Sequence, residues 1–238
     1  MTDIKSILSA EKECERKTKK ILKKGIDFND ELFTQYLKFS GKYCRGGSKR
    51  DTESPLAILL LNDKIVKSLF CISSLLKKGH YPECLSLQRD VLEAICLVEY
   101  ISKNPEVSDL WINGKQMSFG KISKKFLLFP DDGEIFGHLC DFTHPNMRST
   151  IGEIDLVESP MGMTFTYEPF FQRDIARASL VHIIQLTFRA LFCYMDYTHK
   201  YYEDIEQADI EKFRHIHEKA VTISKFLVEK QDLQNKIE

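Results

Sequence analysis

Apolar side chains recur every three or four positions along most of this chain, and this spacing constrains its fold more than any other feature. An α-helix turns once in 3.6 residues, so side chains spaced in this way line one face that can be buried. The 238 residues include only 11 glycines and 7 prolines, fewer than a sandwich or barrel with many turns would need. We therefore predict an all-α fold, a helical bundle.

Glycine and proline mark the ends of the predicted helices, because glycine suits a helix C-terminus and proline a first turn. We expect the first helix to stop at Gly25 and the second to run from about Asn29 to the Gly46-Gly47 pair. The remaining helices are expected at 54–76, 81–103, 105–111, 132–143, 171–202 and 208–236. The helix at 171–202 is apolar nearly all round and should be central, whereas the last helix is more polar and should lie outside.

The period changes between residues 150 and 168, where apolar and polar side chains alternate as in a strand. Ser159-Pro160-Met161-Gly162 lies in the middle and has residues that suit a type I turn. We predict one small β-hairpin inserted in the bundle. The whole chain, 1–238, is then one domain, with a basic N-terminal helical pair (1–50), central helices (55–146), the hairpin (150–168) and two long C-terminal helices (171–236).

The composition indicates a cytoplasmic protein. The seven cysteines include no close pair of the metal-binding kind, and several lie within apolar runs, which fits a reducing compartment. The first 25 residues are too charged for a signal peptide, and His182, Gln185 and Arg189 interrupt the longest apolar stretch. We therefore expect no membrane span.

The formal net charge is -1, but its distribution is uneven. Residues 1–50 hold 13 Lys and Arg against 7 Asp and Glu, a local charge of +6. Such a run is either a solvated helix face or a patch that contacts phosphates. RNA is therefore retained as a candidate partner of the N-terminal basic face.

Arg89 and Glu93 form the most informative local pattern. Arg89 falls on the apolar stripe of its helix, and Glu93 follows four residues later near the same face. Charges on a buried face need partners, because their desolvation is costly. Two readings stay open: an internal pair that ties helices together, or part of a pocket for an anion or nucleotide.

A second pattern, Asp141-Phe142-Thr143-His144-Pro145-Asn146, lies where a predicted helix ends. The helix dipole favours a charged imidazole there, and imidazole also transfers protons near neutral pH. Capping alone is one reading, and a functional histidine is the other. We expect a binding or interaction role for a pocket lined by Arg89, Glu93, Trp111, Asp141, His144, Asn146 and Arg148.

These same residues resemble a family of mostly bacterial helical proteins that carries a domain-of-unknown-function label. The resemblance covers roughly residues 80 to 150 and rests on Arg89 and Glu93, on Trp111 after a proline, and on the 141–146 segment. Asp141 stands where that family usually has serine. The resemblance implies a helical fold and no established activity. We separately expect a homo-oligomer or a protein partner.

The chain is also similar, more distantly, to HEPN proteins, many of which are metal-independent ribonucleases of toxin and phage-defence systems. Their signature is an arginine and a histidine four to six residues apart, and Arg177 and His182 have this spacing. On a continuous helix five positions turn the chain by about 140°, so the two side chains would point to different sides. This alternative implies an RNA endonuclease with catalytic candidates His144, Arg89, Glu93, Arg177 and His182.

His182, Gln185, Arg189 and Asp196 form a polar line on one face of the same helix. The line fits a solvent edge or a hydrogen-bonded contact between helices, or else a catalytic surface. Two sets of acidic and histidine side chains, one from Glu134 to Asp141 and one from Asp196 to Glu203, lack a complete metal signature. We expect neither a metal nor a cofactor.

Overall fold

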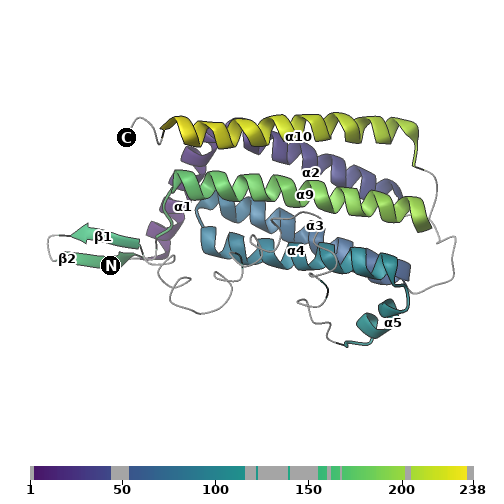
Figure 1. The fold of residues 1–238 in the computed structure, drawn as a ribbon. Coiled ribbons are helices and arrows are strands. Elements are labelled where there is room, and N and C mark those ends of the chain that lie inside the picture. Colours follow the sequence, from purple (N-terminus) through teal and green to yellow (C-terminus); the bar gives the residue numbers. More distant parts are fainter. Residues whose placement is uncertain are drawn as a thin grey trace.

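The computed structural model describes residues 3–43, 54–115, 122, 139, 155–159, 162–166, 168–201 and 205–234. Helix dominates these residues, so the predicted all-α class is confirmed (Figure 1). The elements are α1 (Ile4–Ile21), α2 (Lys23–Tyr43), α3 (Ser54–Lys78), α4 (Tyr81–Lys103), α5 (Val107–Ile112), β1 (Asp155–Ser159), β2 (Gly162–Thr166), α9 (Arg173–Tyr201) and α10 (Gln207–Gln234).

The start of α4 at a proline and the end of α3 at a glycine were predicted correctly, whereas the end predicted at Gly46-Gly47 lies outside the described residues. Pro82 lies in the first turn of α4, where its missing N–H leaves no helical bond unmade. Gly79 follows α3 with φ +88°, a left-handed conformation that side chains disfavour. The observed starts and ends of α3, α4, α9 and α10 lie within about two residues of the predicted ones.

The prediction that the first helix stops at Gly25 was wrong. α1 ends at Ile21 and α2 begins at Lys23, so Gly25 lies inside α2 and no helix starts at Asn29. A Cβ at Gly25 would come within 2.7 Å of Leu180 Cδ2 and 3.2 Å of Leu227 Cδ1. Gly25 therefore allows α2 to approach α9 and α10 closely, rather than ending a helix.

The central position of α9 was predicted correctly. α9 packs against α2, α3, α4 and α10, and Figure 1 shows it in the middle of the bundle with α10 along the outside. Tyr194, Tyr197 and Tyr201 of α9 are among the largest fully buried side chains of the core. The protein thus builds its core around one helix that is apolar on nearly every side.

Among the described residues one helix, α9, is long and apolar enough by length and composition to cross a membrane. Of its most apolar window, 67% is buried inside the bundle. A core helix with these properties meets the same criterion, so the finding is weak evidence for a membrane span.

The strands β1 and β2 pair antiparallel, with Asp155 opposite Thr166 and Ser159 opposite Gly162. Of the helix predicted at 132–143, only Leu139 is described; it is helical and 2% exposed. The rest of that prediction lies outside the described residues.

Candidate functional site

The Arg89–Glu93 pair lies on α4, and the two side chains contact each other. Arg89 Nη2 is 2.8 Å from Glu93 Oε1, and the side chains are 18% and 30% exposed. The i,i+4 spacing in the sequence therefore does produce an ion pair. The pair is half-buried beside the fully buried Val91 and Leu92, so its charges are only partly desolvated.

Two polar contacts align α4 with α9. Gln88 Nε2 donates to the carbonyl of Ser179 at 3.4 Å, and the Tyr201 hydroxyl donates to the carbonyl of Ser102 at 3.2 Å. Lys200 Nζ also donates to the Ser102 carbonyl. The two helices therefore run parallel, and the part of α4 that follows Gln88 lies level with the part of α9 that follows Ser179.

Charged side chains of both helices surround the Cys193 thiol of α9. Desolvation and, to a smaller extent, the nearby charges of Glu99 and Asp196 raise the pKa of this thiol to about 12, against an opposing effect of Arg189. The thiol is therefore protonated at neutral pH and is a poor nucleophile. The same interactions show that Glu99 of α4 and Arg189 of α9 share one neighbourhood.

Arg177 and His182 differ in their surroundings. Arg177 is 5% exposed, its Nη1 is 3.8 Å from Asp174 Oδ1, and this nitrogen has no hydrogen-bond partner among the described residues. His182 is half-buried. Because α9 is continuous between them, the two side chains point in different directions, as the helical geometry predicts.

The predicted polar line on α9 follows the edge of the bundle. Gln185 and Asp196 are exposed, whereas His182 and Arg189 are half-buried. Along the bundle axis, His182 and Arg189 therefore lie level with the part of α4 that contains Arg89, Glu93 and Glu99.

Trp111 does not lie beside the Arg89–Glu93 pair. It is on α5, which follows the C-terminal end of α4 and packs against α3 (Figure 1). Arg89 precedes the last residue of α4 by 14 positions, about 21 Å along the helix axis at 1.5 Å per residue. The structure thus brings Glu93 to Arg89 but places Trp111 near the other end of α4, against the core.

The remaining predicted site residues, Asp141, His144, Asn146 and Arg148, lie outside the described residues. So do Glu134 and His138 of the first metal set and Glu203 of the second. Within the part of the chain that is described, no group of three or more His, Cys, Asp or Glu side chains could hold a metal ion.

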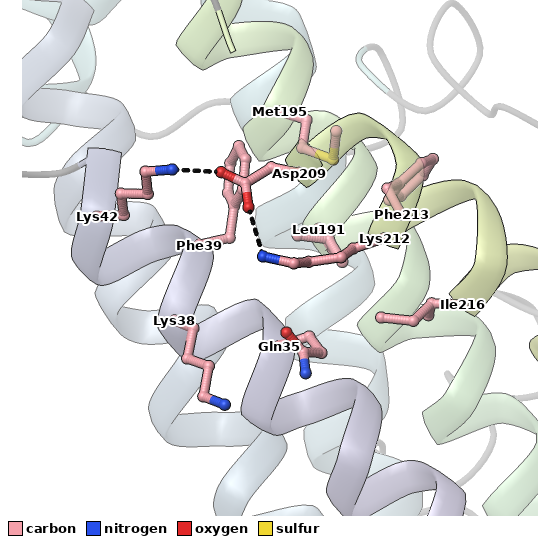
Figure 2. A pocket seen from close by; sticks show the side chains of 10 residues that line it. All are labelled: Gln35, Lys38, Phe39, Lys42, Leu191, Met195, Asp209, Lys212, Phe213 and Ile216. Atoms are coloured by element: carbon pink, nitrogen blue, oxygen red, sulfur yellow. Dashed lines mark hydrogen bonds and ion pairs between the residues drawn. The ribbon is translucent and has the colours of Figure 1, made fainter. Parts of the chain in front are cut away.

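A pocket of about 180 Å³ between α2, α9 and α10 was not predicted from the sequence (Figure 2). Lys42 Nζ of α2 lies 2.7 Å from Asp209 Oδ2 and 2.7 Å from Glu206 Oε2, and Lys212 Nζ lies 3.3 Å from Asp209 Oδ1. Tyr43 donates its hydroxyl to the same carboxylate at 2.9 Å. Burial tends to raise the pKa of Asp209, but hydrogen bonds from Lys42, Tyr43 and Lys212 outweigh burial and lower it.

The sequence offered only a weak signal for this pocket. Lys38 and Lys42 are four residues apart on α2, but Asp209 and Lys212 follow more than 160 positions later. Local periodicity cannot show that such distant residues meet.

The chain was also compared with protein-family models, curated proteins and solved structures, and none of the three comparisons finds a match.

Proposed function

We propose that this chain is a cytoplasmic helical-bundle protein with a binding or interaction role, and that its site lies on the face shared by α4 and α9. One observation carries the proposal. The half-buried Arg89–Glu93 pair of α4 lies level with the half-buried His182 and Arg189 of α9. Partly desolvated cations on two neighbouring helices favour an anionic group, such as phosphate or carboxylate.

The proposal also includes the predicted residues of the 141–148 segment. As predicted from the sequence, the proposed pocket includes His144 and Asn146 near Arg89 and Glu93, with Asp141 and Arg148 as further candidates for ligand binding. An imidazole and a guanidinium that meet in this way would supply hydrogen-bond donors from two directions. Trp111 is not needed for this site.

Inorganic pyrophosphate is the probe that tests the site. At a hundred times its Kd, a ligand of the folded state adds about 2.7 kcal/mol of stability, which raises the Tm of a chain of this size by about 5–10 °C. We expect this rise for the parent and for the control Arg16→Gln, whose arginine is exposed on α1 and paired with Glu13. The rise should be lost in Arg89→Gln. An equal rise in Arg89→Gln, or no rise in the parent, contradicts the proposal.

A metal-independent ribonuclease of the HEPN type is the second candidate, and the buried guanidinium of Arg177 favours it. Its Nη1, 3.8 Å from Asp174 Oδ1, has no hydrogen-bond partner among the described residues, so one donor of this guanidinium is unsatisfied in the folded chain. In this reaction a histidine, His144 or His182, takes the proton of the RNA 2'-hydroxyl. The 2'-oxygen attacks the adjacent phosphorus and forms a 2',3'-cyclic phosphate, while the P–O5' bond breaks and the 5'-oxygen takes a proton from water. Arg177 or Arg89 stabilises the negative charge that develops on the phosphate.

Incubation with total RNA in EDTA tests the ribonuclease. The parent should cleave RNA, the His215→Ala control should cleave equally because His215 is exposed on α10, and either His144→Ala or His182→Ala should be inactive. Intact RNA with the purified parent contradicts this candidate.

Three further points belong to the proposal. We expect a homo-oligomer or a protein partner, which the large exposed side chains Leu56, Leu60 and Phe70 of α3 support. RNA contact would use the basic face of α1, whose Lys5, Lys12 and Lys20 are exposed. The segment 150–168 forms a hairpin inserted in a single helical domain, and the pairing of β1 with β2 supports this point.

A further inference from the structure

We propose that the pocket between α2, α9 and α10 binds an amphipathic monoanion, an anionic headgroup on an aliphatic body. This site is separate from the α4–α9 face, and the proposal does not depend on the function proposed above. Two adjoining hollows of opposite character carry the inference.

The first hollow is the cationic one shown in Figure 2. Lys38, Lys42 and Lys212 line it together with the half-buried Gln35. Leu191, Phe39 and Ile216, which are 3%, 8% and 5% exposed, form its apolar lining. Ammonium groups above an apolar lining provide a place where a carboxylate can be held while the carbon chain leaves water.

The cationic side chains around this hollow outnumber the acidic ones by one. Lys42 and Lys212 are matched by Glu206 and Asp209. Lys38, on the exposed side of α2, has no ion pair within the described part of the chain. One unmatched ammonium favours a headgroup with a single negative charge.

The second hollow adjoins the first and is mostly apolar. It measures about 400 Å³ and shares Met195 and Phe213 with the cationic hollow. Phe192, Ile205 and Ile210 complete its apolar lining, and the Phe192 side chain is 49% exposed. A body that lies along Met195 and Phe213 would cover this apolar surface.

The direction of the ligand follows from the remaining charges. Asp196 and His199 also line the apolar hollow, and the Asp196 carboxylate would repel a second carboxylate. The headgroup therefore lies at Lys38, and the aliphatic body extends toward Phe192. An anion without an apolar body would leave the second hollow empty and bind far more weakly.

Isothermal titration calorimetry with sodium decanoate, kept below its micelle concentration, tests the site. We expect one decanoate per chain for the parent and for Lys20→Glu, a matched charge reversal at an exposed lysine of α1. In Lys38→Glu the affinity should fall at least tenfold, while the thermal shift with pyrophosphate is unchanged. Sodium acetate should bind the parent at least tenfold more weakly than decanoate.

Four results would overturn the proposal. They are no decanoate binding to the parent, equal affinity in Lys38→Glu, an equal loss in Lys20→Glu, and acetate that binds as tightly as decanoate. Failure of the pyrophosphate experiment alone would leave this site standing, because Arg89, Glu93, His182 and Arg189 do not line either hollow.

Discussion

A chain of three buried polar side chains joins α2 to α3. The Tyr36 hydroxyl donates to Asn62 Oδ1 at 2.5 Å, and Asn62 Nδ2 donates to Ser40 Oγ at 2.9 Å. In Tyr36→Phe the Asn62 oxygen loses its buried donor, and we expect the free energy of unfolding to fall by about 1–3 kcal/mol. Urea unfolding measures this change.

The control for this prediction is Lys67→Ala. Lys67 forms an exposed ion pair with Asp63, 2.6 Å away, and its loss should change stability by less than about 0.5 kcal/mol. Equal effects of the two substitutions would show that the buried hydrogen bond contributes no more than a surface charge pair.

The separation of two partners along the chain explains which contacts of the candidate sites could be predicted from the sequence. Arg89 and Glu93 are four positions apart on one helix, so their ion pair follows from helical geometry. Lys42 and Asp209 are separated by 167 positions, and their contact depends on how α10 lies against α2. Only the first kind of contact can be read from a single sequence.

At the scale of elements, Gly25 and Gly41 of α2 offer a matched pair of substitutions. A Cβ at Gly25 would meet the buried Leu180 side chain at 2.7 Å, whereas a Cβ at Gly41 has nothing within 4 Å. We expect Gly25→Ala to lower the free energy of unfolding by about 1–3 kcal/mol, because the packed core must shift. Gly41→Ala should raise it by about 0.5–1 kcal/mol, because alanine favours the helix.

Chemical denaturation of both glycine variants checks this prediction. Stabilisation by Gly25→Ala would show that α2 does not rely on a missing side chain to reach α9. This role also explains why the α1–α2 boundary was mispredicted: a glycine that ends a helix and a glycine that admits a neighbouring helix look alike in sequence.

A second element, α1, is held to the start of α4 by charge. Glu11 Oε1 lies 2.8 Å from His80 Nε2, and Glu11 Oε2 lies 3.2 Å from Lys78 Nζ. The hydrogen bond from His80 and the neighbouring Lys78 hold the pKa of Glu11 below its ordinary value of 4.5. A lowered carboxyl pKa adds stability above the ordinary value, and this stability is lost as the pH falls through the pKa of the folded state.

We therefore expect the Tm difference between the parent and Glu11→Gln to be largest near neutral pH. The difference should shrink as the pH falls below 4.5, the ordinary value for this carboxyl. Thermal unfolding from pH 7 to pH 3 measures it. A difference that is the same at every pH would mean that Glu11 acts by packing rather than by charge.

For the whole molecule, the helical period and the proline and glycine positions were enough to predict the bundle with α9 at its centre. The arrangement of α10 against α2, and with it the pocket of Figure 2, required the tertiary structure. The local period reports which face of a helix is buried, but not which other helix covers that face.

The exposed apolar face of α3 leads to a prediction about assembly. Phe70 is 65% exposed, with Leu56 and Leu60 on the same helix. In the homo-oligomer proposed above, the parent should have a mass in solution of at least twice 27.7 kDa, and Phe70→Glu should lower it toward that of one chain. Leu37→Glu on α2 is the control, because its side chain is also exposed. Light scattering that finds the same mass for all three proteins contradicts an interface at α3.

The proposed anion site on the α4–α9 face can be tested most directly by histidine NMR with added pyrophosphate. We predict that the ¹⁵N-labelled imidazole signals of His144 and His182 shift in the parent and stay unchanged in Arg89→Gln. The signal of His215, exposed on α10, should not move in either protein. Pyrophosphate that leaves His144 and His182 unchanged, or shifts them equally without Arg89, would contradict the account.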